Sequence, residues 1–119
     1  PYGIISAPCS MRTLATIANG TGDTLIARAA DVTLKERRKL VLLTRETPLH
    51  EVHLANMLTV TRLGAVVLPP MPAFYNHPRT IEDIVDQVVM RTLDQFGLQS
   101  MRARRWDGEL LRADDQGED

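Results

Sequence analysis

The sequence predicts an α/β fold with a parallel, doubly wound sheet and right-handed crossovers. Short apolar runs suited to strands, at residues 3–5, 40–43 and 65–68, alternate with longer helical patterns in the order β-α-α-β-α-β-α. A polar cluster follows each run, at residues 8–13, 45–48 and 71–78. Ligands in open α/β sheets bind just past the carboxyl ends of strands. We therefore expect these clusters to form three walls of one site.

Composition limits the class of protein. The chain has 119 residues, of which 44% are hydrophobic and 24% charged, and a net charge of −1. We expect one domain over residues 1–98, a charged tail over residues 99–119 and a cytoplasmic location. The charge argues against nucleic acid and anionic membrane as partners. The lone Cys9 cannot form an intramolecular disulfide, which suits a reducing compartment.

Local signals place the first two helices. Ser10 is a plausible N-cap for a helix over residues 11–18 that ends at Asn19-Gly20. A second helix is expected over residues 23–38, and its basic end suits the helix dipole. Its predicted buried side consists of Leu25, Ile26, Ala29, Ala30, Val32 and Leu34.

Prolines and glycines delimit the later elements. Pro48 suits the first position of a helix that continues to Leu63, and Gly64 ends it. Several prolines should fix residues 69–78 as a rigid, extended loop. Thr80 then caps a last helix that ends at Gly97. The apolar stripe expected on that helix consists of Ile81, Ile84, Val85, Val88, Val89 and Phe96.

Each cluster has both a functional and a structural interpretation. Residues 10–13 offer backbone N–H groups, a hydroxyl and a cation to an anion, but any capped βα turn shares most of these. Arg45 and Glu46 follow a buried strand, where a simple ion pair on the rim is the alternative. Tyr75 offers a hydroxyl to a phosphate or a ring, unless it only packs on its prolines. Arg91 is by default an exposed arginine.

Six blocks of sequence, in register, resemble the UbiX-type flavin prenyltransferases from about residue 4 to residue 108. They are Cys9-Ser10-Met11-Arg12-Thr13-Leu14, Arg28-Ala29-Ala30-Asp31-Val32, Leu34-Lys35-Glu36-Arg37-Arg38, Arg45-Glu46-Thr47-Pro48-Leu49, Pro69-Pro70-Met71-Pro72-Ala73-Phe74-Tyr75 and Arg91-Thr92-Leu93-Asp94-Gln95-Phe96-Gly97. The family's glycine-rich flavin-phosphate loop has no counterpart in these blocks. We therefore expect the first strands of the sheet to belong to a segment outside this sequence.

The resemblance implies that residues 1–98 are the C-terminal portion of an FMN-binding flavoprotein domain. The implied fold is a flavodoxin-like, Rossmann-like three-layer sandwich that assembles into a homo-oligomer, a dodecamer in the family. It implies a metal-independent prenyltransferase that transfers a dimethylallyl group from dimethylallyl monophosphate to reduced FMN. The prenylated FMN is the cofactor of partner UbiD-type decarboxylases, which act on aromatic acids.

The resemblance also assigns roles to individual residues. Ser10, Met11, Arg12 and Thr13 are implied to contact FMN, and Arg45 to contact the flavin of a neighbouring subunit. Tyr75 and Arg91 are implied to hold the prenyl phosphate. Arg28, Lys35 and Glu46 are placed at the reaction centre, where cations stabilise a departing phosphate and a carboxyl group transfers a proton.

Other interpretations stay open at this stage. Within the same flavoprotein superfamily, the rival enzyme is an FMN-dependent cysteine decarboxylase, and a non-catalytic truncated subunit is a further alternative. Residues 82–86 resemble an acidic metal motif only weakly, because the helix dipole already favours acids there. His50 and His53 lack a convincing third metal ligand.

Overall fold

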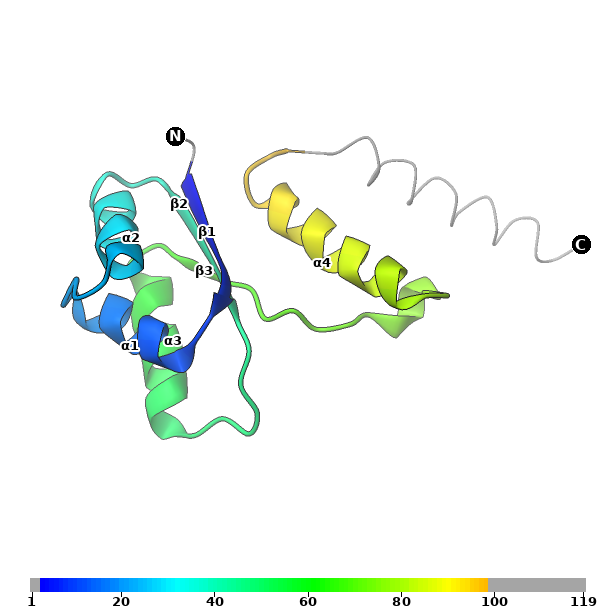
Figure 1. Ribbon diagram of the computed structural model, residues 1–119, viewed down its shortest axis with the longest axis horizontal. Coiled ribbons are helices and arrows are strands. Elements are labelled where there is room, and N and C mark those ends of the chain that lie inside the picture. Colours follow the sequence, from blue (N-terminus) through cyan, green and yellow to red (C-terminus); the bar gives the residue numbers. More distant parts are fainter. Residues whose placement is uncertain (1–2, 99–119) are drawn as a thin grey trace, which may run out of the picture. The chain divides into compact units, whose positions relative to one another are not determined.

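The structure, a computed structural model, describes residues 3–98 (Figure 1). Its elements are β1 (Gly3–Cys9), α1 (Met11–Asn19), α2 (Leu25–Lys35), β2 (Lys39–Thr44), α3 (Glu51–Arg62), β3 (Val66–Val67), a 3-10 turn η1 (Phe74–Asn76) and α4 (Ile81–Asp94). The predicted element order is confirmed. The chain divides into two compact units, residues 1–70 and 71–119, and each is described by itself. The tail predicted over residues 99–119 lies outside the described residues.

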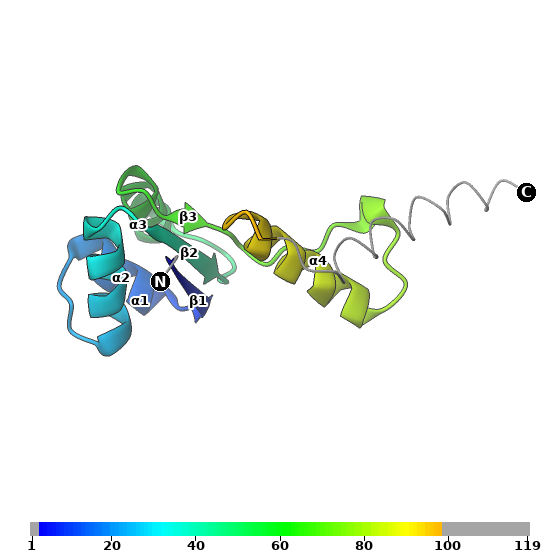
Figure 2. The same cartoon turned by 90° about the horizontal axis from the view of Figure 1, so that it is seen from above.

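The first unit contains a parallel three-stranded sheet in the order β1-β2-β3, which confirms the α/β class. Its central strand β2 contributes Leu40, Val41 and Leu42, all fully buried, as a run of apolar residues predicts for a covered parallel strand. The helices α1, α2 and α3 lie together on one side of the strands in both views (Figures 1 and 2). Leu14 of α1 and Val60 of α3 pack in the same core as β2.

A bulge in β1 shifts its pairing with β2. Ser6 is level with Leu42 and Cys9 with Thr44, so three steps along β1 match two steps along β2. Pro8 lies inside this irregular stretch and has no N–H to give to the ladder. The bulge therefore extends β1 to Cys9, beyond the strand predicted at residues 3–5.

The predicted buried side of α2 is wrong in part. The helix is shorter than predicted, from Leu25 to Lys35, because Thr24 is its N-cap and accepts a hydrogen bond from the Ala27 N–H. The helix buries Ala27, Ala30 and Thr33, whereas Leu25, Ile26 and Val32 are exposed. Small side chains allow the helix to approach the sheet closely. The number and spacing of apolar residues in the sequence do not reveal that the small residues form the buried side.

The predicted start of α3 at Pro48 is also wrong, whereas its end is confirmed. His50 is the N-cap: its Nδ1 accepts a hydrogen bond from the Val52 N–H at 3.1 Å. His53 Nδ1 accepts in turn from the His50 N–H at 3.3 Å, which completes a reciprocal capping box. The helix therefore begins at Glu51, and Gly64 ends it with φ of 108°.

The next strand is shorter than the predicted residues 65–68. Regular pairing covers only Val66 and Val67, although the Leu68 N–H still donates to the Leu42 carbonyl at 2.8 Å. The edge strand β3 of the three-stranded sheet is therefore short.

In the second unit, the structure describes residues 71–98, which contain most of the proline-rich loop and α4. The loop is not extended throughout as predicted, because Phe74–Asn76 form a 3-10 turn that His77 closes by donating its N–H to the Phe74 carbonyl. Thr80 caps α4 as predicted, and its hydroxyl accepts from the Asp83 N–H.

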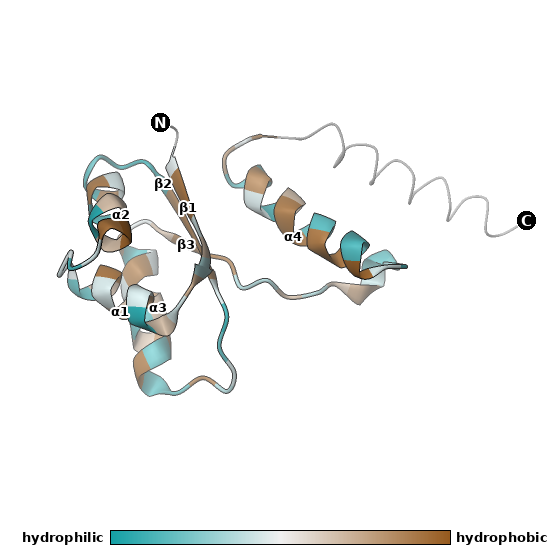
Figure 3. Cartoon of the chain, viewed as in Figure 1, coloured by the Kyte–Doolittle hydropathy of each residue, from teal (hydrophilic) through white to brown (hydrophobic). Residues whose placement is uncertain are grey.

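The predicted apolar stripe of α4 is not its buried side. Figure 3 shows the apolar positions along this helix, yet Ile81, Val85 and Val89 are exposed. The buried positions are the polar Gln87 and Thr92. A stripe read from the sequence identifies an apolar face but not whether a neighbour covers it. Among the described residues, no helix has the length and apolar character needed to span a bilayer.

Candidate functional site

The carboxyl edge of the sheet brings two predicted clusters together. Cys9 ends β1, Thr44 ends β2, and the two residues are paired in the sheet. Neighbouring strands lie about 4.8 Å apart. Ser10 and Arg45, the next residues on each chain segment, therefore leave the sheet side by side.

The Ser10 turn presents the amino end of α1. The Ser10 Oγ accepts a hydrogen bond from the Thr13 N–H at 3.1 Å, so the N-cap prediction is confirmed. The first turn of α1 contains no acidic residue, and Arg12 is exposed there. No carboxylate of this turn neutralises the positive end of the helix dipole. The turn is therefore suited to an anionic or hydrogen-bond-accepting group.

Arg45 and Glu46 are exposed at the end of β2. The Glu46 carboxylate accepts a hydrogen bond from the Thr47 N–H at 3.1 Å, which holds it close to the loop backbone. A rim ion pair was the alternative interpretation, but within residues 3–98 no such pair joins Arg45 to Glu46. A cation and a carboxylate are thus both available to a bound molecule at this edge.

Two buried groups lie directly beneath the edge. The Thr44 side chain is 1% exposed, and its Oγ1 has no hydrogen-bond partner among the described residues. An unsatisfied buried hydroxyl costs about 1–3 kcal/mol, so it marks a place where a polar partner fits. Burial raises the pKa of the Cys9 thiol, and a hydrogen bond with Ser6 offsets part of that effect. Cys9 is therefore a packing residue, as its sequence context indicates.

Thr44 was missed by the sequence reasoning. Its position as the last residue of an apolar strand was visible in the sequence. That its hydroxyl lacks a partner depends on the packing of the surrounding side chains.

The residues Arg28 and Lys35 lie on α2, and the structure does not bring both of them to the Ser10 edge. Lys35 is the last residue of the helix, and the chain enters β2 at Lys39, at the opposite end of the sheet. β2 has six residues, so this end lies about 17 Å from the Arg45 edge at 3.3 Å per step. Within one chain, Lys35 and Arg45 therefore belong to opposite ends of the sheet.

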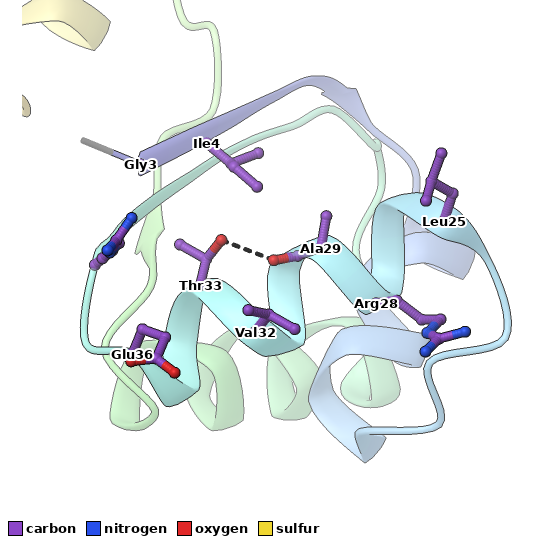
Figure 4. Close-up of a pocket in the computed structure, with 9 residues that line it drawn as sticks. Gly3, Ile4, Leu25, Arg28, Ala29, Val32, Thr33 and Glu36 are labelled. Atoms are coloured by element: carbon purple, nitrogen blue, oxygen red, sulfur yellow. Dashed lines mark hydrogen bonds between the residues drawn. The ribbon is translucent and has the colours of Figure 1, made fainter. Parts of the chain in front are cut away.

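A cavity of about 580 Å³ lies between α2 and the start of β1. Its lining is mostly apolar and includes Ile4, Ala29 and Val32 (Figure 4). The Arg28 side chain forms part of the wall and extends toward the turn at Gly22, where a β-carbon would lie 3.3 Å from the Arg28 Cγ. The cavity is thus separate from the Ser10 turn.

Tyr75 and Arg91 both belong to the second unit. Tyr75 is the middle residue of η1 and is 81% exposed, so it does not pack on its prolines. Arg91 is exposed in the last turn of α4. Both side chains are therefore accessible to a ligand from solvent.

His50, His53 and Asp83, which lie in the segments considered as metal motifs, accept hydrogen bonds at helix N-termini. The His50 and His53 rings are stacked with centroids 3.6 Å apart, and both Nδ1 atoms accept backbone N–H groups. Asp83 Oδ2 accepts from the Arg79 and Thr80 N–H groups. In the part of the chain that the structure describes, no cluster of three or more His, Cys, Asp or Glu residues is arranged to hold a metal ion.

Comparison with known proteins identifies the family. The profile of the family named Flavoprotein matches residues 3–93. The chain belongs to the Flavoprotein family. Within this family it is similar to a probable UbiX-like flavin prenyltransferase of Bacillus subtilis, with 62% identity over 106 residues, 89% of this chain and 52% of that protein. It is also 52% identical to the flavin prenyltransferase LpdB of Lactiplantibacillus plantarum, over 90% of this chain and 57% of that protein.

Solved structures of this kind share the fold. The structure of AnUbiX (PadA1) in complex with FMN and dimethylallyl pyrophosphate has a TM-score of 0.81 and 61% identity, over 82% of this chain and 52% of that chain. A dodecameric FMN-dependent UbiX-like decarboxylase from Escherichia coli O157:H7 has a TM-score of 0.84 and 60% identity, over 89% and 57%. The predicted resemblance is confirmed. This member of the Flavoprotein family spans about half the length of the curated relatives that it matches.

Proposed function

We propose that this chain forms the part of a flavin prenyltransferase that transfers a dimethylallyl group from dimethylallyl monophosphate to reduced FMN. The observation that carries the proposal is the pairing of Cys9 with Thr44, which sets the Ser10 turn beside Arg45 at one edge of the sheet. A structure with 61% identity was solved with FMN and dimethylallyl pyrophosphate. That structure therefore contains FMN and the pyrophosphate ester of the dimethylallyl group proposed for transfer by this chain.

The Ser10 turn is the proposed flavin site. Backbone N–H groups of Met11 and Arg12, with the hydroxyls of Ser10 and Thr13, suit the oxygen and nitrogen acceptors of FMN. Arg45 adds a cation beside them. The unpartnered Thr44 hydroxyl and the absence of an acidic residue in the first turn of α1 both fit such a ligand. Reduced FMN supplies the electron-rich ring that accepts the prenyl group.

Tyr75 and Arg91 are the proposed holders of the prenyl phosphate. A guanidinium binds phosphate oxygens through paired N–H donors, and a phenol adds one more donor. Arg28 and Lys35 stabilise negative charge on the departing phosphate. The carboxyl group of Glu46 donates a proton to that phosphate or accepts one from the closing ring.

Assembly is part of the proposal, because one chain separates these groups. Lys35 precedes β2, at the end of the sheet opposite the Arg45 edge. We propose that a second copy supplies Lys35 to the reaction centre beside Arg45. We propose a homo-oligomer, a dodecamer like the E. coli O157:H7 relative, whose product serves a UbiD-type decarboxylase in the cytoplasm.

The direct test is anaerobic incubation of the purified chain with reduced FMN and dimethylallyl monophosphate, followed by mass spectrometry of the extracted flavin. A flavin heavier by one five-carbon unit supports transfer by this chain. Flavin that stays bound but unchanged favours the FMN-dependent cysteine decarboxylase. If no flavin binds, the segment that the longer relatives possess is required, and the same assay on a chain extended by that segment decides the proposal.

Variants of the phosphate site test the assigned roles. Arg91→Ala should raise the KM for dimethylallyl monophosphate about tenfold or more, because a charge-assisted hydrogen bond contributes about 1.5–3 kcal/mol. Tyr75→Phe should have a smaller effect of the same kind, and FMN affinity should not change. Arg79→Ala removes another exposed arginine of this unit and is the matched control. Equal loss of FMN binding and activity in both variants would contradict the roles.

A further inference from the structure

The Tyr75 turn is tied at both ends to one helix. At the far end, the Arg79 and Thr80 N–H groups both donate to Asp83 Oδ2, at 2.8 and 3.1 Å. At the near end, the Ala73 N–H donates to Gln87 Oε1 at 3.3 Å. Asp83 and Gln87 are four residues apart on α4, so they share one helix face. The intervening turn is thus closed against that face.

Gln87 is an unusual residue for its position. Its side chain is 5% exposed, and its Nε2 has no hydrogen-bond partner among the described residues. Leaving a buried donor unpaired costs about 1–3 kcal/mol, whereas an apolar side chain of similar size would not incur that cost. Packing alone therefore does not explain an amide here. The bond to Ala73, 14 residues away in sequence, is the interaction that requires it.

We propose that Gln87 is a positioning residue for Tyr75; the proposal rests on the assignment of Tyr75 and Arg91 to the prenyl phosphate. Ala73 directly precedes η1, so fixing its N–H fixes where the turn around Tyr75 begins. Arg91 follows Gln87 by four residues on the same face of α4. Gln87 and Arg91 are thus about one helical turn apart, a rise of about 5.4 Å. Across this distance, one phosphate group can be contacted by side chains on both of its sides.

Fixing the turn in advance lowers the cost of binding. Without the Gln87 bond, the phosphate would have to order the chain around Tyr75 as it binds, at about 1–2 kcal/mol for each backbone residue fixed. This cost falls on binding of the prenyl phosphate. The reacting atoms and the flavin site are not affected by it.

The first experiment measures the anchor itself, in the full chain and without any substrate. Gln87→Met keeps the side-chain length but removes the acceptor, and Thr92→Val is the matched control. Thr92 is also buried on α4, but among the described residues its hydroxyl bonds within the helix, to the Val88 carbonyl at 2.8 Å. Amide hydrogen exchange at Ala73 should become about tenfold faster in Gln87→Met, as expected for the loss of one hydrogen bond. It should not change in Thr92→Val.

The second experiment measures the consequence for the substrate. Gln87→Met should raise the KM for dimethylallyl monophosphate about tenfold with kcat within about twofold, because uniform binding is what is lost. FMN affinity should stay the same. Gln87→Glu retains an acceptor for the Ala73 N–H and should restore part of the KM. A purely structural role would instead change kcat, FMN affinity and KM together.

Two results would overturn the inference. One is unchanged exchange at Ala73 in Gln87→Met, and the other is faster exchange with a KM no different from that of Thr92→Val. The first result does not depend on activity. A wild-type chain that binds flavin but transfers no prenyl group contradicts the proposed function instead, so the two failures are distinguishable.

Discussion

The Ser10 turn and the Tyr75 turn hold their polar groups in different ways. The Ser10 turn continues directly from β1, whose last residue is buried and paired with the end of β2. Within residues 71–98, the Tyr75 turn follows no strand, and two side chains of α4 hold it through backbone N–H groups. Groups held by a core share the stability of the unit, whereas groups held by single bonds depend on single residues.

The largest expected effect is at the core beneath the Ser10 turn. Leu42→Ala should lower the free energy of unfolding by about 2–5 kcal/mol, because Leu42 is fully buried on the central strand. Leu58→Ala is the matched control, since Leu58 is 50% exposed on α3 and should cost about 0.5 kcal/mol or less. Urea denaturation measures both. Equal losses would mean that the sheet does not support this edge.

The reaction rate of the buried Cys9 thiol, below the Ser10 turn, measures how well the core is closed there. Native Cys9 should react with iodoacetamide at least about tenfold more slowly than in the urea-unfolded chain, because it is 1% exposed and only transient opening uncovers it. Because burial raises its pKa, the native rate should also increase at higher pH than the rate of an exposed thiol. Equal rates in native and unfolded protein would contradict a rigid edge.

The N-caps of α1 and α4 sharpen the comparison between the two turns. Ser10→Ala and Thr80→Ala each remove a capping hydroxyl and should each cost about 1 kcal/mol of stability. Only Ser10→Ala should also weaken FMN binding, which isothermal titration calorimetry or flavin fluorescence measures. If both variants lost FMN equally, the flavin site would not be specific to the Ser10 turn.

The smallest expected effect is at Thr44. Thr44→Val removes a hydroxyl without a partner and should leave stability unchanged or raise it by about 1 kcal/mol in the free protein. Thermal unfolding with and without FMN measures this. A variant that gains stability alone but loses FMN-induced stabilisation would show that the hydroxyl contacts the ligand.

The sequence was sufficient to predict an element where the signal was local, as in a continuous apolar strand or a helix cap. The run from Leu40 to Leu43 predicted the central strand, and Ser10 predicted a cap, because both signals are local. The sides that helices bury were not predictable in the same way. Ala27 and Gln87 are buried although larger apolar neighbours are exposed, and this depends on the distance between elements.

The candidate site, like the fold, was predicted from the sequence only in part. The meeting of Ser10 with Arg45 follows from two parallel strands and was predictable. The separation of Lys35 from that edge follows from its place just before β2, and this order along the chain was visible in the sequence. The anchoring role of Gln87 required knowledge of a contact between residues distant in sequence.

The bulge in β1 acts as a spacer that sets how far the Ser10 turn extends beyond the sheet. It adds one residue to β1 between Ser6 and Cys9, and one strand residue corresponds to about 3.3 Å. Deleting Ala7 would draw Ser10 back by about that distance relative to Arg45 and reverse the side to which it points. A deletion in the 21–23 turn would leave the edge unchanged. Changes in chain length should therefore be tolerated between α1 and α2 but not within this short stretch of β1.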